Sequence, residues 1–378
     1  MTTGTVMGPT ALEEPAVRQV TAAVYEVPTD QPEADGTLTW SSTTLVRATV
    51  TAGGQAGTGY TYASGACKPL IEGPLAAAVR GRSVLDNGAA WQSMVQAVRN
   101  LGRPGLASCA ISAVDAALWD LKATLLGVPV SQLLGTVRAE VPVYGSGGFT
   151  TYGQDAARAQ LERWTGEWGI PRVKIKIGEA WGTRPDRDLA RVAFARSVIG
   201  PDAELYVDAN GGYGRKQAIR MARAMERHDV SWFEEPVSSD DLDGLREVRD
   251  QVIPDVAAGE YGYDLAYFAR MVAAGAVDCL QVDVTRCGGI TEFVRAAAVA
   301  AASGLQVSAH CAPSLHAQVC AAVPNFRHLE YFHDHARIES MLFDGHLTPA
   351  DGVLCPDATR PGLGIALKDA DAEPFRVA

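Results

Sequence analysis

The sequence lacks the features that mark several large classes of protein. It has no Cys-x-x-Cys pair, and its seven cysteines are scattered, which argues against a structural zinc site or a disulfide framework. No window approaches the roughly 18 consecutive apolar residues of a membrane span, and the first residues have neither the basic start nor the apolar centre of a secretion signal. Lys and Arg number 33 against 44 Asp and Glu, a net charge of −11 that disfavours nucleic acid as a partner. We therefore expect a cytoplasmic protein with no nucleic-acid or membrane partner.

The chain is long enough, at 378 residues with 47% hydrophobic residues, for a large barrel or two ordinary domains. Residues 1–15 are predicted to be a short flexible tail. Residues 16–140 begin with short alternating runs typical of a strand meander and continue with helix-period segments, which predicts an α+β capping domain. In residues 141–355, short apolar runs each lead into a helix-period segment, the pattern of an α/β chain folded as a (β/α)8-type, TIM-like barrel. Residues 356–378 are expected to return to the capping domain.

One ionisable residue recurs near the end of each predicted barrel strand. Glu234 follows Asp208 by 26 residues, and Glu260 follows Glu234 by the same number, which is about the length of one strand–helix unit. The whole series is Lys174, Lys176, Asp208, Glu234, Glu260, Asp283, His310 and Glu330. Strand carboxyl ends meet at one face of such a barrel, where active sites are built, so we expect these side chains to converge. A single acid at a strand end is more often a helix cap or a loop residue, but independent capping would not produce an ordered series.

Three carboxylates at one barrel mouth would repel one another unless a cation lay between them. Ligands that are all oxygen suit Mg²⁺, with Mn²⁺ as an alternative. Glu234 and Glu235 are adjacent and face opposite ways on an extended strand, so we predict that Glu234, which keeps the 26-residue spacing, is the ligand and Glu235 a supporting or salt-bridged residue. Lys174 and Lys176 are two residues apart, so both amines point into the barrel.

Taken together and in order, the motifs resemble those of the enolase superfamily, and within it the mandelate racemase subgroup. The resemblance covers the whole chain and rests on VKIKIG, VDANGGY, FEEP, AAGE, QVDVTRCGGIT, VSAHCAPS, LEYF and RPGLGI. It implies that Asp208, Glu234 and Glu260 bind Mg²⁺ and that Asn210 lies beside the metal.

The resemblance also implies roles for the remaining polar residues in removing the proton alpha to a carboxylate. Lys176 would be the base on one face of the substrate, and His310, oriented by Asp283, the base or acid on the other. Lys174 would help neutralise the substrate carboxylate, and Glu330 would donate a hydrogen bond to its oxygen. To donate, Glu330 must be protonated, and we expect burial near the substrate carboxylate to keep it so. The dianionic enolate that results needs concentrated positive charge. A lysine base must be neutral near pH 7, and we expect the second lysine and the cation to lower its pKa.

Segments 29–37 and 59–65 of the capping domain are candidates for reading the far end of the substrate. Both are polar, which favours a hydroxylated substrate over a hydrocarbon. The candidate substrate-binding residues in and beyond these segments are Tyr60, Tyr62, His333 and His335. The two tyrosines are equally compatible with strand packing, and the two histidines with a solvated loop.

The leading hypothesis is dehydration of a sugar acid to a 2-keto-3-deoxy acid through an enolate. A racemase or epimerase of a hydroxy acid, and a cycloisomerase of an anhydro-sugar acid or lactone, would use the same enolate. A Schiff-base aldolase, with Lys174 or Lys176 forming the imine, would leave the three acids unused. Neither the aldolase nor a non-catalytic sugar-binding protein needs the regular spacing of the series. Members of the family are commonly homo-oligomers, and we expect the same here.

Overall fold

The computed structural model describes residues 15–378, so the predicted tail lies, apart from Pro15, outside the described residues. The chain begins with an antiparallel sheet of order β1-β2-β3. Its strands are β1 (Gln19–Ala34), β2 (Thr39–Ala52) and β3 (Gln55–Tyr62). Tight connections at residues 35–38 and 53–54 join them, as the glycine-rich turns of the sequence predict.

Helices cover one side of this sheet. The longest begins at Leu106 and ends where Gly127 adopts a left-handed conformation (φ 70°). Most of its apolar residues are buried, and those that include Ile111, Val114 and Leu118 pack with residues of the sheet in one hydrophobic cluster. The helical segments here are α1 (Cys67–Leu70), η1 (Ile71–Leu75), α2 (Ala76–Val79), α3 (Asn87–Ala97), α4 (Leu106–Leu126) and α5 (Val130–Leu134).

The following strands form a closed parallel barrel, confirming the predicted (β/α)8 architecture. Neighbouring strands pair in sequence order, and β11 closes the ring by pairing with β4. A short strand, β13 (Val353–Leu354), adds to β4 in the antiparallel direction. The barrel strands are β4 (Val141–Gly147), β5 (Arg172–Lys176), β6 (Glu204–Asp208), β7 (Val230–Glu234), β8 (Asp255–Ala258), β9 (Cys279–Val282), β10 (Gln306–Ala309) and β11 (Phe326–Phe332).

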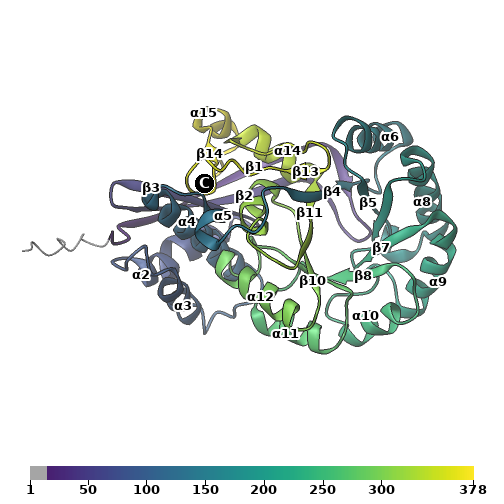
Figure 1. Ribbon diagram of the computed structural model, residues 1–378, viewed down its shortest axis with the longest axis horizontal. Coiled ribbons are helices and arrows are strands. Elements are labelled where there is room, and N and C mark those ends of the chain that lie inside the picture. Colours follow the sequence, from purple (N-terminus) through teal and green to yellow (C-terminus); the bar gives the residue numbers. More distant parts are fainter. Residues whose placement is uncertain (1–14) are drawn as a thin grey trace, which may run out of the picture.

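Helices surround the barrel on the outside (Figure 1). They are α6 (Gln154–Glu162), η2 (Arg163–Glu167), α7 (Glu179–Gly182), α8 (Pro185–Ile199), α9 (Arg215–Met225), η3 (Glu226–His228), α10 (Leu242–Arg249), α11 (Leu265–Ala273), α12 (Ile290–Ala302), α13 (Pro313–Cys320) and α14 (His333–Leu342). Among the described residues, no helix is both long enough and apolar enough to cross a bilayer.

The end of the chain runs back to the capping sheet. It contains β12 (Phe343–Asp344), β14 (Ala366–Leu367), α15 (Asp369–Ala372) and η4 (Glu373–Phe375). The amide of Val377 donates to the carbonyl oxygen of Val24 in β1 at 2.9 Å.

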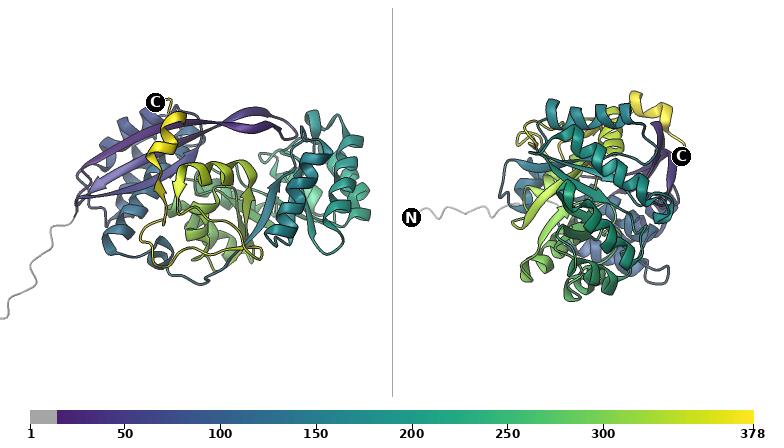
Figure 2. Two further views of the ribbon diagram at one scale, coloured as in Figure 1. Left: turned by 90° about the horizontal axis from the view of Figure 1, so that it is seen from above. Right: turned by 90° about the vertical axis from the view of Figure 1, so that its right-hand side faces the viewer.

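The distal parts of β1 and β2 form a two-stranded ribbon that extends from the capping sheet across the barrel (Figure 2). Gly36, in its turn, lies against the barrel loops that follow β5 and β6. A Cβ added at Gly36 would lie 2.5 Å from the carbonyl oxygen of Ile177 and 3.0 Å from that of Ala209. Only a residue without a side chain permits this approach, which holds the ribbon over the strand ends.

Candidate active site

Neighbouring strands bring the polar residues of the series to one end of the barrel. Lys176, Asp208 and Glu234 are the last residues of β5, β6 and β7, and they are register partners across these strands. Glu260 lies two residues past β8, and Asp283 lies directly after β9. His310 directly follows β10, and Glu330 lies within β11. The convergence expected from the spacing is therefore present.

Asp208, Glu234 and Glu260 form a compact cluster of buried carboxylates. Each offers an oxygen, and the three oxygens lie within 4.8 Å of one another. One oxygen of Glu260, Oε2, is buried with no hydrogen-bond partner among residues 15–378. The Asn210 amide donates to Asp208 Oδ1 at 2.9 Å, which fixes that carboxylate. Three converging hard oxygens with one unsatisfied fit a divalent cation such as Mg²⁺.

Burial and mutual repulsion change the pKa values of acids in this cluster. Burial, and then repulsion from carboxylates such as Asp208, raises the pKa of Glu234 to about 8 in spite of the Lys174 amine. Trp232 donates a hydrogen bond from Nε1 to Glu234 Oε2 at 2.9 Å, which orients this carboxylate. Trp232 belongs to an aromatic layer with Tyr144 and Tyr206 inside the barrel. The acidic cluster therefore lies next to a layer of fully buried aromatic side chains.

Both lysines carry their amines into this acidic environment. Lys174 is fully buried, contacts Glu234, and lies 2.7 Å from Glu330 Oε1. Lys176 Nζ lies 2.5 Å from Asp208 Oδ2. Burial favours the neutral amine of Lys176, but the Asp208 carboxylate outweighs it and holds the pKa of Lys176 above its usual range. The lowered pKa expected from the sequence is thus not produced by the protein groups alone, because each lysine faces an acid.

His310 and Asp283 form a hydrogen-bonded pair next to the acidic cluster. His310 Nδ1 lies 2.8 Å from Asp283 Oδ2, and the Thr285 amide donates to Asp283 Oδ1 at 2.6 Å. With Nδ1 held in this way, His310 Nε2 lies 3.4 Å from Glu260 Oε2. Burial lowers the pKa of His310, but the Glu260 carboxylate, with smaller contributions from other acids, leaves it raised.

Glu330 differs from its sequence-based interpretation. Its Oε1 accepts a hydrogen bond from Ser146 Oγ at 2.6 Å, and Lys174 contacts the same oxygen. Burial favours the neutral acid, but Lys174 and His310 outweigh it and hold the pKa of Glu330 well below its usual range. A protonated Glu330 donating to substrate was expected, and the neighbouring cations instead favour its carboxylate.

A cavity of about 320 Å³ lies between the barrel and the capping ribbon. Four members of the barrel series line it together with Asn210, namely Lys176, Glu260, His310 and Glu330. Asp208, Glu234 and Lys174 do not line it and are fully buried. The capping domain contributes hydroxyl and carboxylate groups to the opposite wall. Its lining residues are Asp35, Leu38, Trp40, Ser42, Thr43, Thr44, Tyr62 and Ala63.

The predicted specificity residues divide into two pairs. Tyr62 and His335 line the cavity, and their rings stack with centroids 3.4 Å apart. Tyr60 does not reach the cavity, because it is fully buried, stacks on Phe343, and donates to Glu339 Oε1 at 2.6 Å. His333 also lies outside the cavity.

Glu235 follows the end of β7 with a positive φ of 38°, and it is not one of the three clustered acids, although it lies next to them. It lines a neighbouring cavity of about 600 Å³, which shares Asn210 and Tyr261 with the active-site cavity. Burial, and then the carboxylate of Glu260, raises the pKa of Glu235 well above its usual value.

Sequence reasoning did not single out Arg286 or Ser146. Arg286 Nη1 lies 3.2 Å from Glu260 Oε1, and Nε lies 3.6 Å from Asp283 Oδ2, so its guanidinium links two acids of the series. Arg286 stands three residues after Asp283, in the loop after β9, and its position after a strand end was the available signal. Ser146, by contrast, lies in a glycine-rich stretch of sequence, VPVYGSGGFT, that contains no charged residue.

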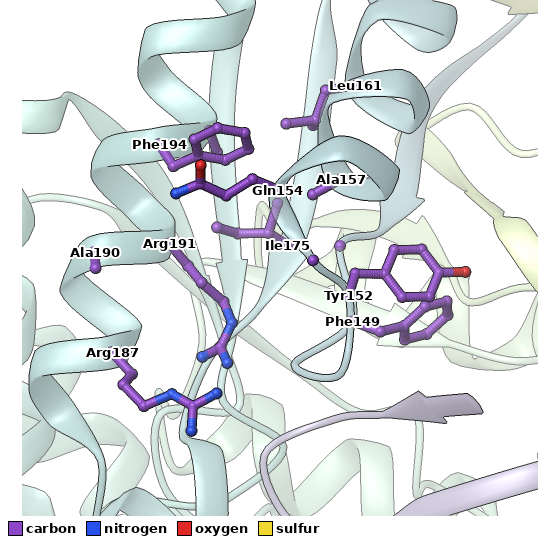
Figure 3. Close-up of a pocket in the computed structure, with 13 residues that line it drawn as sticks. Phe149, Tyr152, Gln154, Ala157, Leu161, Ile175, Arg187, Ala190, Arg191 and Phe194 are labelled. Carbon is purple, nitrogen blue, oxygen red and sulfur yellow. The ribbon is translucent and has the colours of Figure 1, made fainter. Parts of the chain in front are cut away.

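A second cavity, of about 270 Å³, lies on the outside of the barrel between α6 and α8. Figure 3 shows Arg187 and Arg191 reaching from α8 on one side and Phe149 and Tyr152 on the other. Both guanidiniums pair with Glu179, and Arg191 also pairs with Asp188, so two acids balance the two positive charges. No member of the barrel series lines this cavity, and the active site is therefore the first one.

A closed parallel barrel whose strand ends carry a metal-ready acid cluster, flanked by a lysine and a histidine, defines a class of metal-assisted proton-transfer enzymes. Residues 156–372 match the family model described as enolase C-terminal domain-like. Residues 19–135 match that of the mandelate racemase/muconate lactonizing enzyme N-terminal domain. The chain belongs to the mandelate racemase/muconate lactonizing enzyme family of the enolase superfamily.

Three relatives indicate the chemistry of the family. A mandelate racemase/muconate lactonizing enzyme-like protein from Rubrobacter xylanophilus is 48% identical (TM-score 0.93; 96% of this chain and 100% of that one). The L-talarate/galactarate dehydratase of Salmonella typhimurium is 33% identical over 74% of this chain and 68% of its own. Its crystal structure with Mg and L-lyxarohydroxamate has a TM-score of 0.88 (28% identity; 99% of this chain and 96% of that one). The 3,6-anhydro-alpha-L-galactonate cycloisomerase of Streptomyces coelicolor is 33% identical over 83% of this chain and 86% of its own.

Homologues of the chain therefore include lyases and isomerases that are named for sugar acids, and Mg²⁺ is the cofactor of the superfamily.

Proposed function

We propose that this enzyme dehydrates a sugar acid to a 2-keto-3-deoxy acid. The observation that carries the proposal is the make-up of the active-site cavity. A lysine and a histidine from different strands face the same space, and the opposite wall presents polar groups such as Asp35, Ser42 and Thr43. These three already have partners within the protein, but Asn210 Oδ1, from another lining residue, is buried with no hydrogen-bond partner among residues 15–378. A polyhydroxylated acid offers donors to such a polar wall, whereas an apolar substrate would leave this oxygen unpaired.

The metal ligands of the proposal are Asp208, Glu234 and Glu260. The cation, when bound, supplies Lewis-acid stabilisation of the negative charge that develops on the substrate carboxylate. Lys174 adds positive charge beneath this position, because its buried amine contacts Glu234 and Glu330. Asn210 holds Asp208 through its backbone amide.

Lys176 and His310 exchange protons with the substrate. One of them takes the proton from the carbon alpha to the carboxylate, and the electron pair left on that carbon forms the enolate. The β-hydroxyl then leaves with a proton from the other residue, so that water is released and the resulting enol tautomerises to the 2-keto acid. Asp283 acts as a positioning residue, because its hydrogen bond to Nδ1 aims Nε2 of His310.

Proton NMR in D₂O tests this proposal with a library of mono- and diacid sugars, Mg²⁺, and an EDTA-treated control. Loss of the alpha-proton signal together with a new 3-deoxy methylene is the expected result. Exchange at the alpha carbon without that methylene would make the enzyme a racemase or epimerase. Ring opening of an anhydro-sugar acid or lactone would make it a cycloisomerase. EDTA-insensitive trapping of a carbonyl substrate by borohydride would instead support a Schiff-base aldolase.

We also propose that the enzyme works in the cytoplasm as a homo-oligomer. Six of its seven cysteines are buried free thiols, which suits a reducing compartment. The association of chains is inferred from family membership, and light scattering after size-exclusion chromatography tests it: an eluting mass near 40.0 kDa would contradict it.

A further inference from the structure

A second cluster of metal-ligating side chains lies outside the active site, where the capping ribbon meets the barrel. Asp30 and Glu33 come from the distal part of β1, and His333 is the first residue of α14. One nitrogen of His333 and one carboxylate oxygen from each acid lie within 4.8 Å of one another. None of these residues lines the active-site cavity.

The local backbone explains how two residues of one strand reach the same histidine. Asp30 and Glu33 are three apart, so on a regular strand their side chains would point to opposite faces. The pairing of β1 with β2 shifts register between Pro28 and Glu33, and this irregularity turns both carboxylates toward α14.

An unsatisfied oxygen points to a ligand. Glu33 is fully buried; its Oε2 accepts a hydrogen bond from Trp40 Nε1 at 2.9 Å. The other oxygen, Oε1, is buried and has no hydrogen-bond partner within residues 15–378. Without a metal, His333 and Asp30 could form an ordinary ion pair, since Nε2 and Oδ2 lie 3.1 Å apart. That pair would still leave the Glu33 oxygen without a partner.

We propose that Asp30, Glu33 and His333 bind a second divalent metal ion of the zinc type. Zinc bound by nitrogen and oxygen at about 2.0–2.2 Å in a tetrahedron has ligand atoms roughly 3.3 Å apart. The 3.1 Å separation of His333 Nε2 and Asp30 Oδ2 matches that spacing. An imidazole with two carboxylates suits Zn²⁺ or Co²⁺, whereas the all-oxygen cluster of the active site suits Mg²⁺.

The position of the site suggests what the metal does. The ribbon is already tied to α14, because Arg337 Nη2 donates to the carbonyl oxygen of Pro28 at 2.7 Å and Thr43 contacts Asp334. Trp40, which holds Glu33, also lines the active-site cavity. A metal at this junction pins the ribbon over the cavity from its outer side, independently of the chemistry within.

Metal counting on the full-length protein tests the proposal. Wild-type protein is dialysed against Zn²⁺ in the presence of Mg²⁺, and bound zinc per chain is measured by elemental analysis. We expect His333→Ala and Glu33→Gln each to bind one zinc fewer than the wild type. The matched control His228→Ala, whose histidine lies in η3 between α9 and β7, is expected to bind the wild-type amount.

The visible spectrum of bound Co²⁺ gives a second readout that does not depend on activity. A cobalt signal that is present in the wild type and lost in His333→Ala supports the site. His333 is partly exposed, so this variant is expected to fold even if Glu33→Gln does not. Zinc counts and cobalt spectra that are the same in the wild type and His333→Ala would overturn the proposal. The dehydration proposal is unaffected by either outcome.

Discussion

Lys176 and Asp208 are register partners on neighbouring parallel strands, and the amine of one lies 2.5 Å from the carboxylate of the other. The same acid is a candidate metal ligand. The Asp208 carboxylate therefore couples metal binding to the pKa of Lys176. When this carboxylate binds a cation, it stabilises the protonated lysine less, and the pKa of Lys176 falls. A neutral lysine is what proton abstraction requires.

Replacing either proton-transfer residue should abolish most of the activity. We expect Lys176→Met and His310→Asn each to lower kcat by roughly 10²–10⁴-fold, the usual contribution of general acid–base catalysis. Steady-state assays on the substrate found by NMR provide the measurement. The controls are Lys216→Met, whose side chain is 72% exposed on α9, and His228→Asn in η3. Comparable rates in Lys176→Met and Lys216→Met would rule out Lys176 as a base.

The adjacent glutamates at the end of β7, Glu234 and Glu235, have different predicted roles, the first as a metal ligand and the second as a supporting residue. Glu234→Gln removes one of the three clustered oxygens, so we expect Mg²⁺ affinity to fall by more than the roughly 10–100-fold typical of changes outside the ligand shell. Glu235→Gln, which faces the neighbouring cavity, should have a smaller effect. Isothermal titration with Mg²⁺ measures both. An equal or larger loss in Glu235→Gln would reverse the assignment.

The barrel residues could be predicted from sequence because the fold turns spacing into position. Asp208 and Glu234 are 26 residues apart, and one strand–helix unit brings the second beside the first. No equivalent rule applies to the capping sheet. Tyr60 and Tyr62 share one face of β3, but Tyr60 packs on Phe343 and only Tyr62 reaches the cavity. That difference depends on where the sheet meets the barrel.

The protonation states of the active-site residues could not be predicted from the sequence either. The expectation of a neutral Glu330 rested on burial, and the outcome was decided by how close Lys174 and His310 lie to it. Arg286 was missed because the series was read one residue per strand, whereas the loop after β9 supplies two charged residues. Spacing predicts which residues meet, but distances of a few ångströms decide their charges.

Glu339 makes stability depend on pH. Burial raises its pKa to about 7, although hydrogen bonds from Tyr60 and Ser314 lower it. The folded state therefore holds this proton more tightly than the unfolded state, in which the carboxyl has its ordinary pKa of 4.5. The stabilisation is fully present below the unfolded pKa and is lost as pH rises through the folded one. It amounts to about 3 kcal/mol at most.

Denaturant unfolding of wild type and Glu339→Gln at several pH values measures this effect. We expect the free energy of unfolding of the wild type, relative to the variant, to decrease between about pH 4.5 and 7. Glu373→Gln, with a side chain that is 70% exposed, is the control and should track the wild type. A constant difference between wild type and Glu339→Gln over this range would contradict the assignment.

The close packing of Gly36 against the barrel holds the capping ribbon in position over the active-site cavity. The Cβ of Gly36→Ala would meet the carbonyl oxygens of Ile177, Gly178 and Ala209 at 2.5–3.0 Å, and these are backbone atoms that cannot rotate away. We expect a loss of about 1–3 kcal/mol in stability from overpacking. KM should rise more than kcat falls, because the displaced ribbon carries Asp35 and Leu38 of the cavity wall. Gly88→Ala, in α3 with open space around it, should instead gain up to about 1 kcal/mol. Kinetics and thermal unfolding of both variants decide the matter: an unchanged KM in Gly36→Ala would mean that the ribbon does not contact the substrate.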